Sequence, residues 1–166
     1  MEHFEVKDLS KFVKANVAKL AVLMDDIAKR PKAGFDMMCY YSDNVIEELA
    51  INKPERAVRV LQHDCQTTAC AAGWAYVSPA FEAARQKYPS LEDFIKHAFG
   101  TECNDYFDRG NQIFSWLFSS AWNIIDNTPQ GVAARARYML THGVPKQEMW
   151  TMDNKEVRAL YKEFLK

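Results

Sequence analysis

The sequence predicts a mainly α-helical protein, folded as a single-domain bundle of about six helices. Its 166 residues suit one domain with one hydrophobic core. Hydrophobic residues make up 48% of the chain and charged residues 26%, which is the composition of an ordinary globular protein. Apolar residues recur at three- and four-residue spacing in segments that follow capping residues and end at glycine or proline. We therefore expect residues 1–166 to form one globular helical domain.

The N-terminal part predicts one long helix, one short helix and a small β element. The long helix covers residues 8–30, and proline and glycine follow it. Its apolar face is formed by Leu9, Phe12, Val13, Val17, Leu20, Leu23, Met24 and Ile27. Residues 35–41 are interpreted as extended and residues 45–50 as the short helix. Residues 56–63 alternate well enough to form a strand, so 35–41 and 56–63 are the candidates for a two-stranded β piece.

The remaining helices are predicted behind side chains that can cap a helix N-terminus. Thr67 or Thr68 can cap a helix that runs through Trp74, and Ser90 with Asp93 resembles a capping box. The other predicted helices cover residues 80–88, 91–99, 113–125 and 130–141, and a last one begins at Asp153. Residues 113–125 are apolar nearly all round, so we expect this helix in the middle of the core.

Two of these segments share a pattern, S/T-P-x-x-x-A-A-R-x-K/R-Y, at residues 78–88 and 128–138. Two independent helices with the same capping chemistry would look alike. A solenoid needs at least about three stacked units. We interpret the similarity as local.

Charge and hydropathy narrow the range of partners. Lys and Arg number 21 and Asp and Glu 22, a net charge of −1, which disfavours a dedicated nucleic-acid binder. No stretch approaches the about 20 apolar residues of a membrane span, and the N-terminus lacks a secretory pattern. We therefore expect no membrane contact and a cytoplasmic location, in the host cell if the chain is encoded by a phage. Four cysteines are too few and too scattered for a disulfide scaffold.

The segment 63–75 is the most informative part of the chain, because two cysteines flank the start of a helix of very small residues. Zinc is one interpretation, and the candidate ligands are His63, Cys65, Cys70, Cys39 and Cys103. Against zinc, Cys65 and Cys70 lie at the wide limit of ligand spacing and no second close pair follows. Two small thiols in the core would explain the same residues, since cysteine is among the most buried residue types. No cofactor is expected on the second interpretation.

Catalytic interpretations of the sequence are weaker. Cys70 could act as a nucleophile at a helix N-terminus, with His63 or His97 as base and Asp64 as orienting group. This requires that the fold brings the three side chains within hydrogen-bonding distance. A polar segment could bind a cation or simply cap helices, and it contains Glu102, Asp105, Asp108, Arg109 and Asn111. No phosphate loop, metalloprotease helix or nucleophile elbow occurs, which argues against an enzyme.

The aromatic residues suggest a surface for a protein partner. Trp116 and Trp122 lie in an apolar run and are expected in the core. Trp150, beside Met149 and Met152, is the better candidate for a partner surface, because aromatic residues and methionine are enriched at interfaces.

Two blocks carry a resemblance to known proteins. Cys65-x-Thr67-x-x-Cys70-x-x-Gly73-Trp74-Ala75 resembles the C-G-T-x-x-C-x-x-G-[H/W]-A segment of small proteins that are common in bacteriophage and prophage genomes. The second and more specific block is Asp126-Asn127-Thr128-Pro129-x-Gly131-x-Ala133-Ala134, and upstream Phe35-Asp36-Met37 also matches. The resemblance covers about residues 35–145. Gln66 stands where these proteins usually have glycine, and residues 44–62 look like an insertion. Members are largely of unknown function, so the resemblance implies no mechanism.

Three functions remain open on the sequence alone. The favoured one is a non-catalytic accessory protein of the phage type that binds another protein, such as a host factor or a defence component. Near-neutral charge, many aromatic residues and no catalytic set support it. The alternatives are a small thiol- or zinc-dependent enzyme that uses residues 63–70, and a module that binds a small ligand beside the small-residue helix.

Overall fold

The prediction of a mainly α-helical protein is confirmed by a computed structural model of the chain. The described residues form eight α-helices, one 3₁₀ turn and two very short strands. They are residues 3–4, 9–30, 33–36, 44–63, 69–100, 112–119, 122, 125–145, 155, 158–159 and 161–162. None of the helices in these ranges has a stretch long and apolar enough to span a bilayer.

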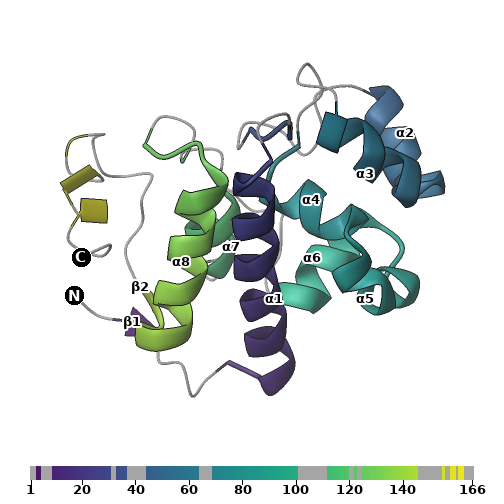
Figure 1. The fold of residues 1–166 in the computed structure, drawn as a ribbon. Helices are drawn as coiled ribbons and strands as arrows, with labels where there is room; N and C mark the ends of the chain where they lie inside the picture. Colours follow the sequence, from purple (N-terminus) through teal and green to yellow (C-terminus); the bar gives the residue numbers. More distant parts are fainter. Residues whose placement is uncertain are drawn as a thin grey trace.

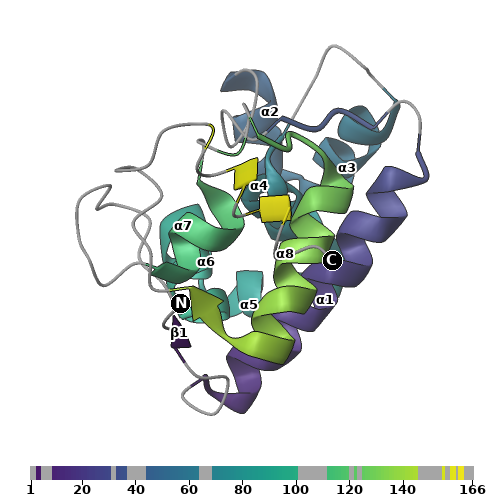
Figure 2. The same ribbon diagram turned by 90° about the vertical axis from the view of Figure 1, so that its left-hand side faces the viewer.

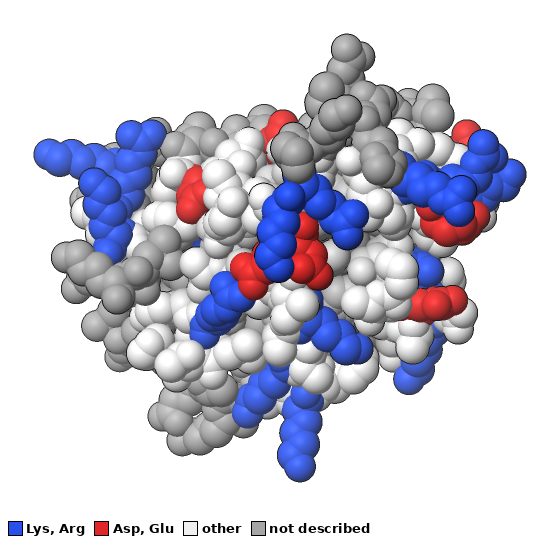
Figure 3. Space-filling model, in the orientation of Figure 1, with Lys and Arg blue, Asp and Glu red and all other residues white. Residues whose placement is uncertain are grey.

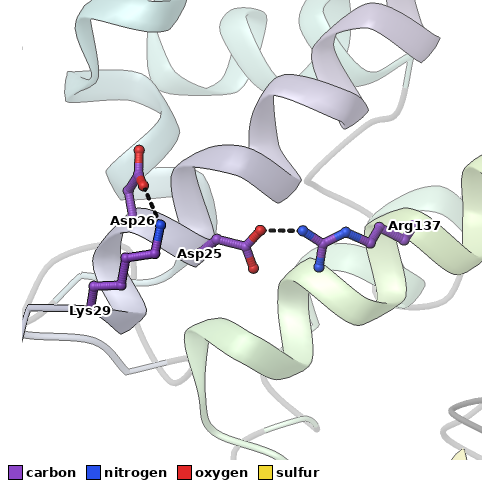
Figure 4. Close-up of polar contacts among 4 residues, drawn as sticks. All are labelled: Asp25, Asp26, Lys29 and Arg137. Carbon is purple, nitrogen blue, oxygen red and sulfur yellow. Dashed lines mark hydrogen bonds and ion pairs between the residues drawn. The ribbon is translucent and has the colours of Figure 1, made fainter.

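Helices α1 and α8 form an antiparallel pair at the front of Figure 1, and Figure 2 shows the same two helices side by side. α1 spans Lys11–Ala28 and α8 spans Pro129–His142. The buried face of α1 runs from Val13 to Ile27 at three- and four-residue spacing, as the sequence predicts. Across the pair, Arg137 of α8 makes an ion pair with Asp25 of α1, while Lys29 and Asp26 pair within the end of α1 (Figure 4).

α2 (Asn44–Asn52) and α3 (Pro54–His63) lie at the upper right in Figure 1. The prediction of a strand at residues 56–63 is therefore wrong. Ala57 and Leu61 are buried one helical turn apart, and this spacing, rather than the short alternation around it, decides the structure. Proline at the first position of α3 costs nothing, because that N–H has no helical partner.

The small β element of the described residues lies elsewhere. β1 (His3–Phe4) pairs in antiparallel fashion with β2 (Val144–Pro145), directly after α8. Phe35 forms a single parallel bridge with Ala69, and most of the predicted strand at 35–41 lies outside the described residues.

Helix α4 (Ala71–Val77) lies inside the molecule, and all seven of its residues are buried. Its N-cap is Cys70, which makes no side-chain capping bond, so the expectation that Thr67 or Thr68 begins this helix is corrected. The indole nitrogen of Trp74 donates a hydrogen bond of 2.8 Å to the Gly34 carbonyl. This bond fixes α4 to the segment that contains Gly34.

The predicted helix 91–99 is confirmed, whereas the predicted helix 80–88 begins with a 3₁₀ turn and its α-helical part is shorter. Ser78 accepts a hydrogen bond from the Ala80 amide at the start of the 3₁₀ turn Pro79–Phe81, which leads into α5 (Glu82–Lys87). α6 (Leu91–Phe99) begins at Ser90, whose hydroxyl accepts from the Asp93 amide. Gly100 ends α6 in the left-handed conformation, with φ of 67°.

α7 covers Gln112–Phe118, so the predicted helix over residues 113–125 ends early. Beyond Phe118 the chain turns back, and the indole nitrogen of Trp122 donates a hydrogen bond of 3.0 Å to the Ser115 carbonyl in the last turn of the helix. Of the predicted last helix, the described residues are helical, namely Lys155, Arg158, Ala159, Tyr161 and Lys162.

Candidate functional site

Residues 69–75 of the cysteine segment lie in the core rather than in an open site. Cys70 is 2% exposed at the start of α4. His63 ends α3, its side chain lies outside the described residues, and so do Cys39, Cys65 and Cys103. Among the residues that the structure describes, no group of three His, Cys, Asp or Glu side chains could hold a metal ion. His97, the other candidate base, lies on the outer side of α6.

Two other predicted sites fall outside the described ranges. They are the partner surface of Met149, Trp150 and Met152, and the polar segment of Glu102, Asp105, Asp108, Arg109 and Asn111. Trp116 and Trp122 are buried, as the sequence predicts, with their rings edge-to-face at 5.6 Å between centroids.

Asp126 organises the start of α8. Its carboxylate accepts hydrogen bonds from the hydroxyls of Thr128 and Tyr161. Thr128 in turn caps α8 by accepting from the Gly131 amide at 3.0 Å. A β-carbon at position 131 would overlap the Asp126 carboxylate, so glycine is required there. The pattern Asp-x-Thr-x-x-Gly of the second sequence block therefore describes one structural unit. Asn127 extends it, donating to the Asp36 carboxylate at 3.1 Å.

Arg135 of α8 is fully buried beneath this unit. Its guanidinium lies 4.0 Å from the centroid of the Trp122 ring, and none of its three side-chain nitrogens has a hydrogen-bond partner in the described part of the chain. Burial lowers the pKa of Arg135 to about 10, against the influence of the nearby Tyr161 and Asp126. The group therefore stays charged at neutral pH. Its side chain has no exposed surface, so we assign it a structural role and not a binding role.

One accessible site among the described residues is a groove between α1, α5 and α6. Its volume is about 490 Å³, and we call it the Phe12 groove. It is lined by Phe12, Ala83, Ala84, Lys87, Tyr88 and His97. Tyr88 and His97 stack face to face along one wall, with 4.0 Å between ring centroids and 11° between planes. On the α5 side the two alanines leave the space open, because neither has a side chain that could fill it.

Phe12 is the residue that sequence analysis placed wrongly. The helical pattern assigns it to the apolar face of α1, but its side chain is 53% exposed. The spacing of the apolar residues in α1 already indicates that Phe12 lies outside the buried face. Val13, Val17 and Leu20 define the buried face, and Phe12 lies about 100° from Val13 on the helix, at the border of that face. A large aromatic side chain outside the stripe points to a surface role.

Basic side chains lie on the helices that form this groove. Lys87 lies on the lining, with its ammonium 5.3 Å from the Tyr88 ring centroid. Lys19 of α1, which does not line the groove, has its ammonium 5.9 Å from the centroid of the Phe81 ring. α1 carries no acidic residue before Asp25. Figure 3 shows the result on this face, where Lys and Arg side chains gather over the lower end of α1.

None of the protein-family models, curated proteins and solved structures compared with the chain matches it. No function comes to the chain from a relative.

Proposed function

We propose that this chain is a non-catalytic accessory protein of the phage type that acts by binding another protein at the Phe12 groove. The observation that supports the proposal is the exposed Phe12 side chain at the edge of an open groove. Aromatic side chains of this kind act as anchors at protein interfaces, where burial in a desolvated pocket gives them most of the binding energy. On this proposal the protein works in the cytoplasm, on a host factor or a defence component.

The geometry is suited to a contact between side chains. About 490 Å³ has room for a few side chains of a partner beside Phe12. The groove walls are helices α1, α5 and α6, which are held by the aromatic core around Phe81, Phe94 and Phe99. A groove with rigid walls loses little conformational entropy when a partner binds.

The test compares two matched surface variants as baits in lysate of the cells that carry the gene. Phe12→Asp places a charge at the groove, and Ile51→Asp places the same charge on α2, where Ile51 is 57% exposed. We expect one protein to be retained by the wild type and by Ile51→Asp but lost from Phe12→Asp. Circular dichroism should show that both variants keep their helices. If no protein depends on Phe12 for its retention, the proposal is wrong.

A small-ligand module is the second candidate, because the stacked Tyr88 and His97 rings form a wall that could receive a flat ring. On this alternative, Phe12→Asp and Tyr88→Ala would abolish a thermal shift caused by a metabolite extract passed through a 3 kDa filter. On the favoured function the same filtrate causes no shift.

A further inference from the structure

We propose that the partner presents an acidic amphipathic helix to the Phe12 groove and to the outer face of α1. The inference rests on the proposed function and specifies the chemistry of the partner. Three features of the described residues carry it: the shape of the outer face of α1, the open apolar groove beside it, and the charge around both.

The outer face of α1 can receive a second helix. Its exposed apolar residues are Phe12, Ala15, Ala18 and Val22, of which Val22 is 60% exposed. They span eleven residues, and the rise from the first to the last is about 15 Å of helix, or roughly three turns. The two alanines between Phe12 and Val22 allow close approach of another backbone, and the larger residues at each end provide contact area. Helices recognised in this way place their own anchors at i, i+3 or i+4, and i+7.

The groove next to this face accepts an anchoring side chain. Ala83 and Ala84 form its α5 side, Phe12 its α1 side, and the stacked Tyr88 and His97 its end. An apolar or aromatic side chain of the partner would contact Phe12 on one side and the Tyr88 ring on the other. Burying such a side chain contributes roughly 1.5–3 kcal/mol.

Charge selects the class of helix. Three lysines lie along α1, namely Lys11, Lys14 and Lys19, and Lys87 lines the groove. The carboxylates of α5 and α6 keep their negative charge, and they are Glu82, Glu92 and Asp93. The basic side chains outnumber them, because Arg85 and Lys96 add to the four lysines. A partner helix with Asp and Glu beside its apolar face would therefore meet a net positive field, which raises the association rate and favours acidic over basic partners.

The experiment selects peptides on the intact chain. A yeast-displayed library of random 16-residue peptides is sorted against the purified protein, and binders are retained if Phe12→Asp loses them and Ile51→Asp does not. We expect the retained peptides to be net negative, with apolar residues at helical spacing. Lys19→Gln with Lys87→Gln should weaken them about tenfold, since each exposed ion pair contributes up to about 1 kcal/mol. The charge-matched control, Lys53→Gln with Lys162→Gln, should leave affinity unchanged.

The outcomes separate the two proposals. If no binder depends on Phe12, both the proposed function and this inference fail. If Phe12-dependent binders are uncharged or basic, or are indifferent to the Lys19 and Lys87 changes, only the acidic-helix inference fails. It also fails if a 20-base-pair DNA duplex binds through the same lysines, or if sedimentation shows a dimer that Phe12→Asp dissociates, because the occupant would then be nucleic acid or a second copy.

Discussion

The hydroxyl of Tyr161 donates a hydrogen bond to the carboxylate of Asp126, 35 residues earlier in the chain. Through this bond a residue near the C-terminus reaches the unit that starts α8. The Tyr161 ring also packs against Trp122, with 5.2 Å between centroids. Burial, with the hydrogen bond to Asp126 as the next cause, raises the pKa of Tyr161 well above its usual value of 10.

This raised pKa predicts a specific loss of stability in alkali. Above pH 10 the unfolded chain loses the Tyr161 proton while the folded chain retains it, so the free energy of unfolding falls as pH rises. Tyr161→Phe should be about 1–2 kcal/mol less stable than wild type at pH 8, because the hydrogen bond is lost. The difference should shrink at pH 11. Urea unfolding at both values measures it, and a difference that stays constant between pH 8 and pH 11 would contradict the prediction.

The overlap between position 131 and Asp126 predicts a non-additive pair of substitutions. Alanine in a helix is favoured over glycine by about 1 kcal/mol, yet Gly131→Ala should destabilise the protein by about 1–3 kcal/mol, because its β-carbon displaces the Asp126 carboxylate. In an Asp126→Ala background the same change should become stabilising. A double-mutant cycle from chemical denaturation tests this. Additive effects would mean that the Asp126 carboxylate is not the reason why position 131 favours glycine.

The buried Arg135 predicts an order of stabilities. Its guanidinium lacks a hydrogen-bond partner among the described residues, so Arg135→Met should be within about 1 kcal/mol of wild type or more stable. Arg135→Lys should be the least stable of the three, because lysine keeps a buried charge and loses the flat contact with Trp122.

The control for this series is Arg137→Met, which breaks only the exposed pair with Asp25 and should cost less than about 1 kcal/mol. Thermal and urea unfolding both report the order. A loss above about 3 kcal/mol in Arg135→Met would instead indicate that the guanidinium has an acceptor in the folded protein.

The position of Cys70 predicts a thiol that does not react while the protein is folded. At 2% exposure it should label with N-ethylmaleimide far more slowly than glutathione at the same pH, and at the glutathione rate once urea unfolds the chain. Mass spectrometry of the tryptic peptide that contains the cysteine locates the label. Rapid labelling of native Cys70 would revive the thiol-enzyme alternative.

Interactions between residues close in the sequence predict most helix ends, but they do not reveal that residues 56–63 form a helix and not a strand. Ser90, Asp93 and Gly100 fix α6 by interactions within a few residues, so sequence alone predicts its bounds. Residues 56–63 show a pattern that fits two structures, and the burial of Ala57 and Leu61 against the rest of the molecule decides for helix. Helix α7 ends earlier than predicted, and the contact of the Trp122 indole with the Ser115 carbonyl beyond that end is one that no helical spacing reveals.

The candidate site was less predictable than the fold. The groove joins Phe12 to residues more than 70 positions later, and only the docking of α1 on α6 brings them together. Arg135 is part of a pattern that repeats Arg85, yet the two differ in burial. Arg85 donates a hydrogen bond of 2.6 Å to the Tyr76 carbonyl, whereas Arg135 is buried against the ring of Trp122. Capping chemistry determines the shared pattern, and tertiary packing determines the difference.

The pairing of α1 with α8 has a consequence for synthesis in the cell. Asp25 and its partner Arg137 are separated by 112 residues, so at about 5–20 residues per second the ribosome delivers α8 on the order of ten seconds after α1. During that interval the apolar face of α1, from Val13 to Ile27, has no α8 to cover it. A nascent chain stalled before residue 129 should therefore recruit trigger-factor-like chaperones and remain sensitive to protease, and it should lose both properties once α8 has emerged.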